Sequence, residues 1–233
     1  MAPYPHEKAL AWLVHLYTAS GIAFAFLSIL EINRQNWSLA MIYMMVCLFI
    51  DGTDGILARK AKVKQTLPHV SGKDIDFVID FVTYALLPAY FFYSADLAPA
   101  SLALPLTLLI LIVSAIYYGI QGMVTEDLTF RGFPVLWNLV VFYQFFVFQS
   151  SPGVNALMIV GFSILHFLPI QISYPSQHLR TDKWQMTMGL LALGGFVGIL
   201  LDYPGRNIIF IGAAWIFMLY FGGKAIQHTW GRK

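Results

Sequence analysis

Residues 132–179 read GFPVLWNLVVFYQFFVFQSSPGVNALMIVGFSILHFLPIQISYPSQHL, a run of 48 residues without Asp, Glu, Lys or Arg. A helix needs only about 20 mostly apolar residues to cross the hydrocarbon of a bilayer. The run is therefore too long for one crossing, and the turn-forming sequence SSPG at 150–153 divides it. We expect one membrane span over 133–148 and a second over 154–172.

Further apolar stretches on both sides of this run also have the length of membrane spans. They cover residues 9–30, 37–59, 76–95, 102–124, 184–201 and 208–222. The sequence therefore predicts an all-α fold, a polytopic transmembrane helix bundle with about eight spans. We expect residues 1–233 to form a single integral membrane domain.

The overall composition supports the same class of protein. Hydrophobic residues make up 58% of the chain and charged residues only 11%, whereas a soluble domain carries about 25% charged residues. This composition excludes a soluble globular or a disordered protein. The net charge of +2, with no basic cluster interleaved with a polar groove, argues against a nucleic-acid partner.

The distribution of basic residues predicts the orientation in the membrane. With the N-terminus inside, twelve of the fourteen Lys and Arg residues fall on the cytoplasmic side, and only Arg34 and Arg206 fall outside. Cytoplasmic loops of membrane proteins carry the excess of Lys and Arg. We therefore expect both termini, and the loop that follows residue 59, to be cytoplasmic.

Four aspartates at the ends of two neighbouring spans stand out, because charges within membrane spans are costly and mark function. Asp51 and Asp54 are three residues apart, and Asp76 and Asp80 are four apart, so each pair shares one helix face. Carboxylates that face one another repel. Two hard divalent cations such as Mg²⁺ or Mn²⁺ remove that repulsion, and such a pair suits phosphoryl transfer.

The residues around these aspartates resemble the signature of the CDP-alcohol phosphotransferases, Asp-x-x-Asp-Gly-x-x-Ala-Arg followed by Gly-x-x-x-Asp-x-x-x-Asp. The match runs through residues 51–80 and covers eight fixed positions: Asp51, Asp54, Gly55, Ala58, Arg59, Gly72, Asp76 and Asp80. The twelve-residue spacer 60–71 is longer than in most members. This spacer and the segments 130–134 and 137–138 resemble the bacterial branch of the family that uses choline as its acceptor.

The resemblance implies a reaction in which CDP-diacylglycerol and choline give phosphatidylcholine and CMP. It implies that the four aspartates hold two divalent ions, Mn²⁺ or Mg²⁺, and that Asp80 is the base, with Asp51 and Asp76 also catalytic. Asp54, Gly55, Ala58, Arg59 and Gly72 would line the nucleotide site. It further implies a homodimer in the bacterial inner membrane, with the active site facing the cytoplasm.

The choline ammonium group donates no hydrogen bond and is usually recognised by aromatic faces with a carboxylate nearby. Tyr84 continues the stripe of Asp76 and Asp80 by one turn. Tyr118, Trp137 and Glu126 lie in or between the next two spans. We expect some of these four residues to form the choline site.

Two other functions stay open at this level. The first is the same chemistry with serine, inositol or a polyol phosphate as acceptor; a polyol phosphate calls for several extra arginines, and Arg131 and Arg180 are the only candidates. The second is a cation transporter that uses the carboxylates as an ion path. Transporter sites usually lie near the bilayer midplane between repeats, whereas these carboxylates lie at one membrane edge and no repeat is evident.

Overall fold

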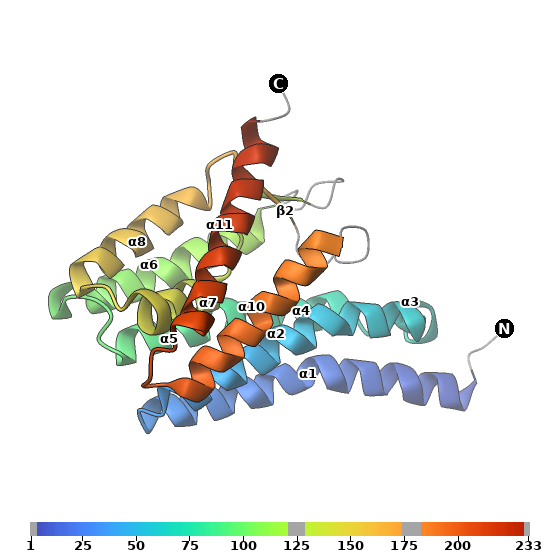
Figure 1. Cartoon of the computed structure of the whole chain (residues 1–233). Helices are drawn as coiled ribbons and strands as arrows, with labels where there is room; N and C mark the ends of the chain where they lie inside the picture. Colours follow the sequence, from blue (N-terminus) through green and yellow to red (C-terminus); the bar gives the residue numbers. More distant parts are fainter. Residues whose placement is uncertain (1–3, 121–128, 174–182, 231–233) are drawn as a thin grey trace. The chain divides into compact units, whose positions relative to one another are not determined.

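The chain is built almost entirely of helices, shown in Figure 1 for a computed structural model. The structure describes residues 4–120, 129–173 and 183–230. These group into two compact units, residues 1–88 and 89–233.

The first unit is organised around its two longest helices. Its elements are α1 (Pro5–Asn33), α2 (Trp37–Lys60), α3 (Val63–Thr66), α4 (Gly72–Phe81) and the π-helical turn η1 (Val82–Leu86). The helix then continues as α5 (Leu87–Ser94). Helix α1 lies alongside α2 and also packs against α4 and η1 (Figure 1). It is therefore the scaffold that holds the other two helices in place.

Small residues on α1 allow this close packing. Ala11, Gly21 and Ala25 are buried along it, and a Cβ on Gly21 would lie only 3.0 Å from Ile79 Cγ2 of α4. The Ser28 hydroxyl donates to the Ala40 carbonyl of α2 at 2.8 Å. Small residues and interhelical hydrogen bonds are the usual means of helix association in a membrane, where burial of apolar surface gives no preference for helix over lipid.

The second unit contains the remaining helices and one short strand pair. The helices are α6 (Ala100–Gly119), α7 (Trp137–Phe142), the π-helical η2 (Tyr143–Phe148), α8 (Pro152–Leu165), α10 (Lys183–Asp202) and α11 (Ile208–Trp230). Strands β1 (Thr129–Arg131) and β2 (Gln171–Ser173) pair antiparallel. Helices α10 and α11 pack closely because a Cβ on Gly195 would lie 2.7 Å from Ala213 Cβ, and one on Gly198 would lie 2.5 Å from Phe210.

The structure confirms the predicted membrane bundle. Among the described residues, five helices are long and apolar enough to cross a bilayer, and three shorter apolar helices cover 137–148, 152–165 and 187–202. Large apolar side chains lie on the outside, for example Leu157, Leu201 and Ile208, each more than 70% exposed. Ser114, Gln144 and His166 are instead fully buried. The large apolar side chains exposed on the outside of the helices mark a surface in contact with lipid.

The span expected over 154–172 is shorter in the structure, because α8 ends at Leu165. Pro169 has no backbone N–H and disfavours helix at the residue before it. The carbonyls of Leu165 and Ile170 instead accept from the backbone amides of Phe133 and Gly132, at 2.9 Å and 2.8 Å. The expected all-α chain thus contains one short strand pair next to this turn.

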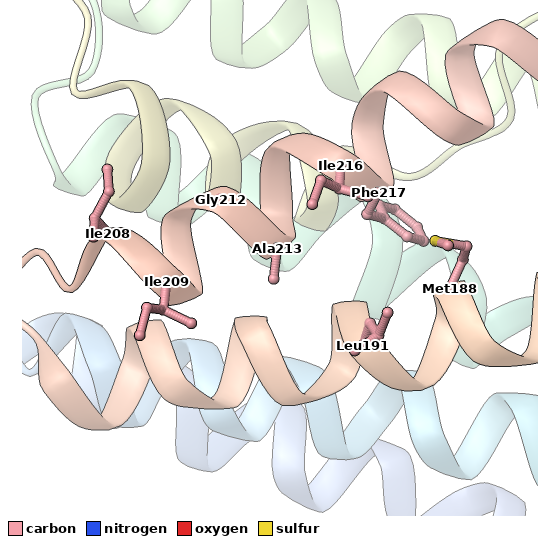
Figure 2. A pocket seen from close by; sticks show the side chains of 8 residues that line it. All are labelled: Met188, Leu191, Ile208, Ile209, Gly212, Ala213, Ile216 and Phe217. Carbon is pink, nitrogen blue, oxygen red and sulfur yellow. The ribbon is translucent and has the colours of Figure 1, made fainter.

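An apolar groove lies between α10 and α11 in the second unit (Figure 2). It has a volume of about 280 Å³, and its lining contains no ionisable side chain: Met188, Leu191, Ile208, Ile209, Gly212, Ala213, Ile216 and Phe217. A groove of this kind suits lipid chains and cannot carry out proton or phosphoryl chemistry.

Candidate active site

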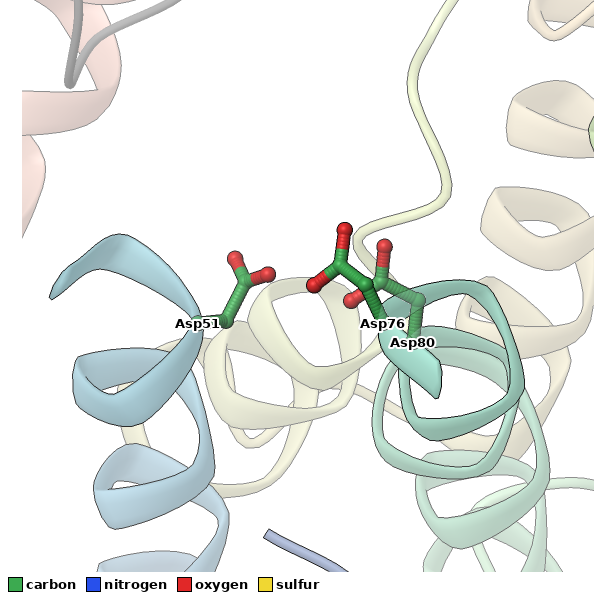
Figure 3. A group of neighbouring side chains, drawn as sticks. All are labelled: Asp51, Asp76 and Asp80. Carbon is green, nitrogen blue, oxygen red and sulfur yellow. The ribbon is translucent and has the colours of Figure 1, made fainter. Parts of the chain in front are cut away.

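Three of the predicted aspartates meet in the first unit (Figure 3). Asp51 comes from α2, and Asp76 and Asp80 come from α4. One carboxylate oxygen from each lies within 4.8 Å of the other two. Asp76 and Asp80 share one face of α4 because they are one turn apart. The meeting with Asp51 depends on α1, which packs against both α2 and α4.

The surroundings of the cluster fit a divalent cation. All three carboxylates are half-buried, and Asp80 Oδ1 is fully buried with no hydrogen-bond partner among the described residues. Among the described residues, the three carboxylates form no ion pair with a basic side chain. Oxygen ligands without nitrogen or sulfur are the set that Mg²⁺ and Mn²⁺ prefer.

Asp54 lies beside this cluster, more deeply in the unit. It is 7% exposed, and Thr18 and Asp76 are among the neighbours of its carboxylate. The group of three mutually close carboxylates does not include Asp54. Its part in metal binding stays a prediction.

Tyr84 contacts the cluster directly. Its phenol donates a hydrogen bond to Asp51 Oδ2 at 2.7 Å, and the side chain is buried. Tyr84 lies in η1, the π-helical turn that follows Asp80. Sequence spacing placed Tyr84 on the stripe of Asp76 and Asp80 but gave no sign that it reaches across to α2.

Two signature glycines have close neighbours. A Cβ on Gly55 would lie 3.3 Å from Arg59 Nη1, so the missing side chain lets the guanidinium rest on the helix. Ala58 and Arg59 lie in the last turns of α2, Ala58 half-buried and Arg59 exposed. A Cβ on Gly72 would lie 3.1 Å from His15 Cε1. Gly72 thus allows α4 to begin close against α1.

The other predicted choline residues belong to the second unit. Trp137 is fully buried, donates from Nε1 to the Ser114 hydroxyl at 2.8 Å, and stacks on His166 with ring centres 5.0 Å apart. That face of the indole is closed to a cation. Tyr118 is half-buried near the end of α6. Glu126 lies outside the described residues.

The fold and the cluster together define an integral membrane protein with an all-oxygen site suited to a divalent cation. The chain belongs to the CDP-alcohol phosphatidyltransferase family, which its residues 11–220 match. It is therefore a phosphatidyltransferase of a family whose members generally depend on a divalent metal.

Several relatives share most of the length of the chain. It is 40% identical to the phosphatidylcholine synthase of Mesorhizobium japonicum, over 81% of the chain and 72% of the relative. It is 37% identical to that of Brucella melitensis, over 94% and 80%. It is also 37% identical to that of Borreliella burgdorferi, over 91% and 90%. These similarities confirm the resemblance to the choline-using branch of the family.

Proposed function

We propose that this protein transfers the phosphatidyl group of CDP-diacylglycerol to choline and releases CMP. The observation that carries the proposal is the cluster of Asp51, Asp76 and Asp80, which presents three carboxylates without a basic partner among the described residues. The choice of choline is supported by relatives named phosphatidylcholine synthase at up to 40% identity.

Asp51, Asp54, Asp76 and Asp80 are proposed to hold two divalent ions, Mn²⁺ or Mg²⁺. Such ions, when bound, supply positive charge opposite the phosphoryl oxygens and the departing CMP. The protein contributes by fixing carboxylates from two helices at one point. The buried orphan oxygen Asp80 Oδ1 supports this assignment, because a buried carboxylate oxygen without a partner is costly unless a cation meets it.

Asp80 is proposed as the base. Its carboxylate takes the proton of the choline hydroxyl while the choline oxygen forms a bond to the phosphorus that carries the diacylglycerol. The bond from that phosphorus to the bridging oxygen of the diphosphate breaks, and CMP leaves with the electron pair. Asp51 and Asp76 keep their carboxylates beside Asp80, where they would hold the divalent ions that position the reacting phosphate.

Gly55, Ala58, Arg59 and Gly72 are proposed to line the cytidine and diphosphate site. Arg59 presents a planar fork of donors that matches phosphate geometry. Its guanidinium lies against Gly55, where a side chain would push it away. The last turn of α2 therefore supports a position for the anionic part of the lipid substrate.

Replacing Gly55 by alanine is expected to raise the KM for CDP-diacylglycerol about threefold, because the new methyl group would lie 3.3 Å from Arg59 Nη1 and shifts the guanidinium slightly, which weakens one charge-assisted contact. Gly52→Ala is the matched control, since it lies in the same helix and a Cβ there meets nothing within 4 Å. Initial rates of CMP release over a range of lipid concentrations measure both. Equal KM values for the two variants would contradict the role given to Gly55 and Arg59.

Some of Tyr84, Tyr118, Trp137 and Glu126 are proposed to recognise the choline ammonium group. We expect Tyr118→Ala to raise the KM for choline at least about tenfold, because an aromatic face contributes up to about 2 kcal/mol to cation binding in a desolvated site. The KM for CDP-diacylglycerol should stay within twofold in the same assay. An equal rise in both constants would remove Tyr118 from the choline site.

The active site is proposed to face the cytoplasm from the bacterial inner membrane. Twelve of the fourteen basic residues fall on the cytoplasmic side in this orientation, including those just after Asp54 at the end of α2. Both termini would then be cytoplasmic. A homodimer is proposed on the resemblance to the family alone.

The proposed function is tested by CMP release from CDP-diacylglycerol by the purified protein in detergent, with Mn²⁺ or Mg²⁺. Choline, serine, inositol and glycerol 3-phosphate are supplied in parallel. Release with choline alone supports the proposal. Release with another acceptor keeps the chemistry and overturns the acceptor, whereas no release with any acceptor or metal favours the ion-transport alternative.

A further inference from the structure

The phenol of Tyr84 donates a side-chain hydrogen bond to Asp51. The donor is the Tyr84 hydroxyl, the acceptor is Asp51 Oδ2, and the two atoms are 2.7 Å apart. Tyr84 is 5% exposed, so its ring is held by packing and cannot swing freely. This bond joins η1 to α2, which belong to the two sides of the carboxylate cluster.

Tyr84 lies in a π-helical turn and reaches Asp51 from there. A regular α-helix from Asp80 would place Tyr84 directly above it, on the face that Asp76 and Asp80 share. The π-turn Val82–Leu86 inserts a wider turn at this point and rotates the residues that follow. Thr83, Tyr84 and Ala85 are all buried there. The turn is thus fixed by packing, and π-turns of this kind are common at functional sites.

From this geometry we infer that Tyr84 is a positioning residue for Asp51. Its hydrogen bond to Oδ2 orients the carboxylate of Asp51, one of the three that would hold a divalent cation. This inference rests on the proposed function, since it assumes a metal between the carboxylates. A residue that donates a hydrogen bond to a metal-binding carboxylate fixes the orientation of that carboxylate. Loss of such a hydrogen-bond partner typically lowers metal affinity or activity about 10–100-fold.

This role differs from the choline contact expected for Tyr84. A choline residue would present its ring face to the ammonium group and would affect the KM for choline. A positioning residue acts through its hydroxyl, so removing the hydroxyl and keeping the ring should weaken metal binding and leave the choline KM unchanged. The variant Tyr84→Phe therefore distinguishes the two roles by its metal affinity and its KM for choline.

The test is a titration of purified protein with Mn²⁺ in the absence of lipid and choline, with free Mn²⁺ followed by electron paramagnetic resonance. Tyr84→Phe is expected to raise the Mn²⁺ dissociation constant by about 10–100-fold. Tyr17→Phe is the matched control, because the Tyr17 hydroxyl is 2.7 Å from the Thr53 hydroxyl of α2 and contacts no carboxylate of the cluster. It should bind Mn²⁺ as the wild type does.

CMP release is then measured at saturating Mn²⁺, together with the KM for choline and the midpoint of thermal unfolding. Weaker Mn²⁺ binding in Tyr84→Phe alone, with the choline KM and the unfolding midpoint unchanged, supports the inference. Wild-type Mn²⁺ affinity in Tyr84→Phe overturns it, as does an equal loss in Tyr17→Phe. A raised choline KM with unchanged Mn²⁺ affinity assigns Tyr84 to the acceptor site. Absence of Mn²⁺ binding in the wild type instead contradicts the proposed metal site itself.

Discussion

Replacing Asp80 by asparagine is expected to lower the rate of CMP release by at least about 10³-fold. Asparagine has the same shape, but it takes no proton at neutral pH and carries no charge for a cation. Asp80 is the member of the cluster with a fully buried oxygen that has no partner among the described residues. Both the proposed proton transfer and the metal contact are therefore lost together. Single-turnover CMP release at saturating metal and lipid measures the effect.

Asp74→Asn is the matched control, because it makes the same chemical change in the same helix. Asp74 lies exposed in the first turn of α4, where its backbone amide donates to the capping Ser71 hydroxyl at 3.2 Å. We expect this variant to keep the wild-type rate within about threefold, since a surface charge of this kind contributes little. Equal loss in both variants, or an active Asp80→Asn protein, would remove Asp80 from the reaction.

Replacing Gly132 by alanine is expected to lower the midpoint of thermal unfolding in detergent by about 10 °C or to prevent isolation of folded protein. Gly132 has φ +76°, a conformation that side chains with a Cβ rarely adopt. A Cβ there would lie 2.0 Å from the His166 carbonyl oxygen, and that oxygen belongs to the backbone. The turn cannot absorb the clash without breaking the hydrogen bond from Gly132 N to Ile170 O.

Gly161→Ala provides the control for Gly132→Ala. Gly161 lies within α8, and a Cβ there meets nothing within 4 Å. Alanine is a better helix former than glycine, so we expect the unfolding midpoint to stay the same or to rise slightly. Size-exclusion profiles and thermal unfolding midpoints compare the stability of the two variants with that of the wild type. A Gly132→Ala protein as stable as the wild type would show that the turn tolerates a side chain.

The turn at Gly132 lies next to a group of packed rings in the second unit, those of Tyr117, Trp137 and His166. His166 follows α8 directly and stacks on Trp137, while Tyr117 meets it edge to face with ring centres 5.4 Å apart. The Tyr117 hydroxyl donates to the Arg131 carbonyl at 3.1 Å. A shift of the backbone at residue 132 therefore disturbs the position of Trp137, one of the residues proposed for choline.

The sequence alone determined the class of protein and predicted the residues of its site. Apolar runs of about 20 residues predict spans whatever their partners, because backbone groups in lipid must be satisfied within the helix. The helix period predicts that Asp76 and Asp80 share a face. Both inferences depend on interactions within one segment, and the structure confirms both: among the described residues five helices are long enough to cross a bilayer, and shorter apolar helices cover 137–148, 152–165 and 187–202.

The tertiary structure decided what depends on contacts between segments. It brought Asp51 to Asp76 and Asp80 and left Asp54 outside that group of three, because the packing of α1 against α2 and α4 sets the distance between the two faces. It placed Tyr84 in a π-turn, which has no pattern in the sequence, and joined its hydroxyl to Asp51 by a hydrogen bond. It ended α8 at Leu165, where amides from residues 132 and 133 take up the free carbonyls. Each of these contacts joins residues that are far apart in the chain. The periodicity of a single segment carries no information about which distant residues come into contact.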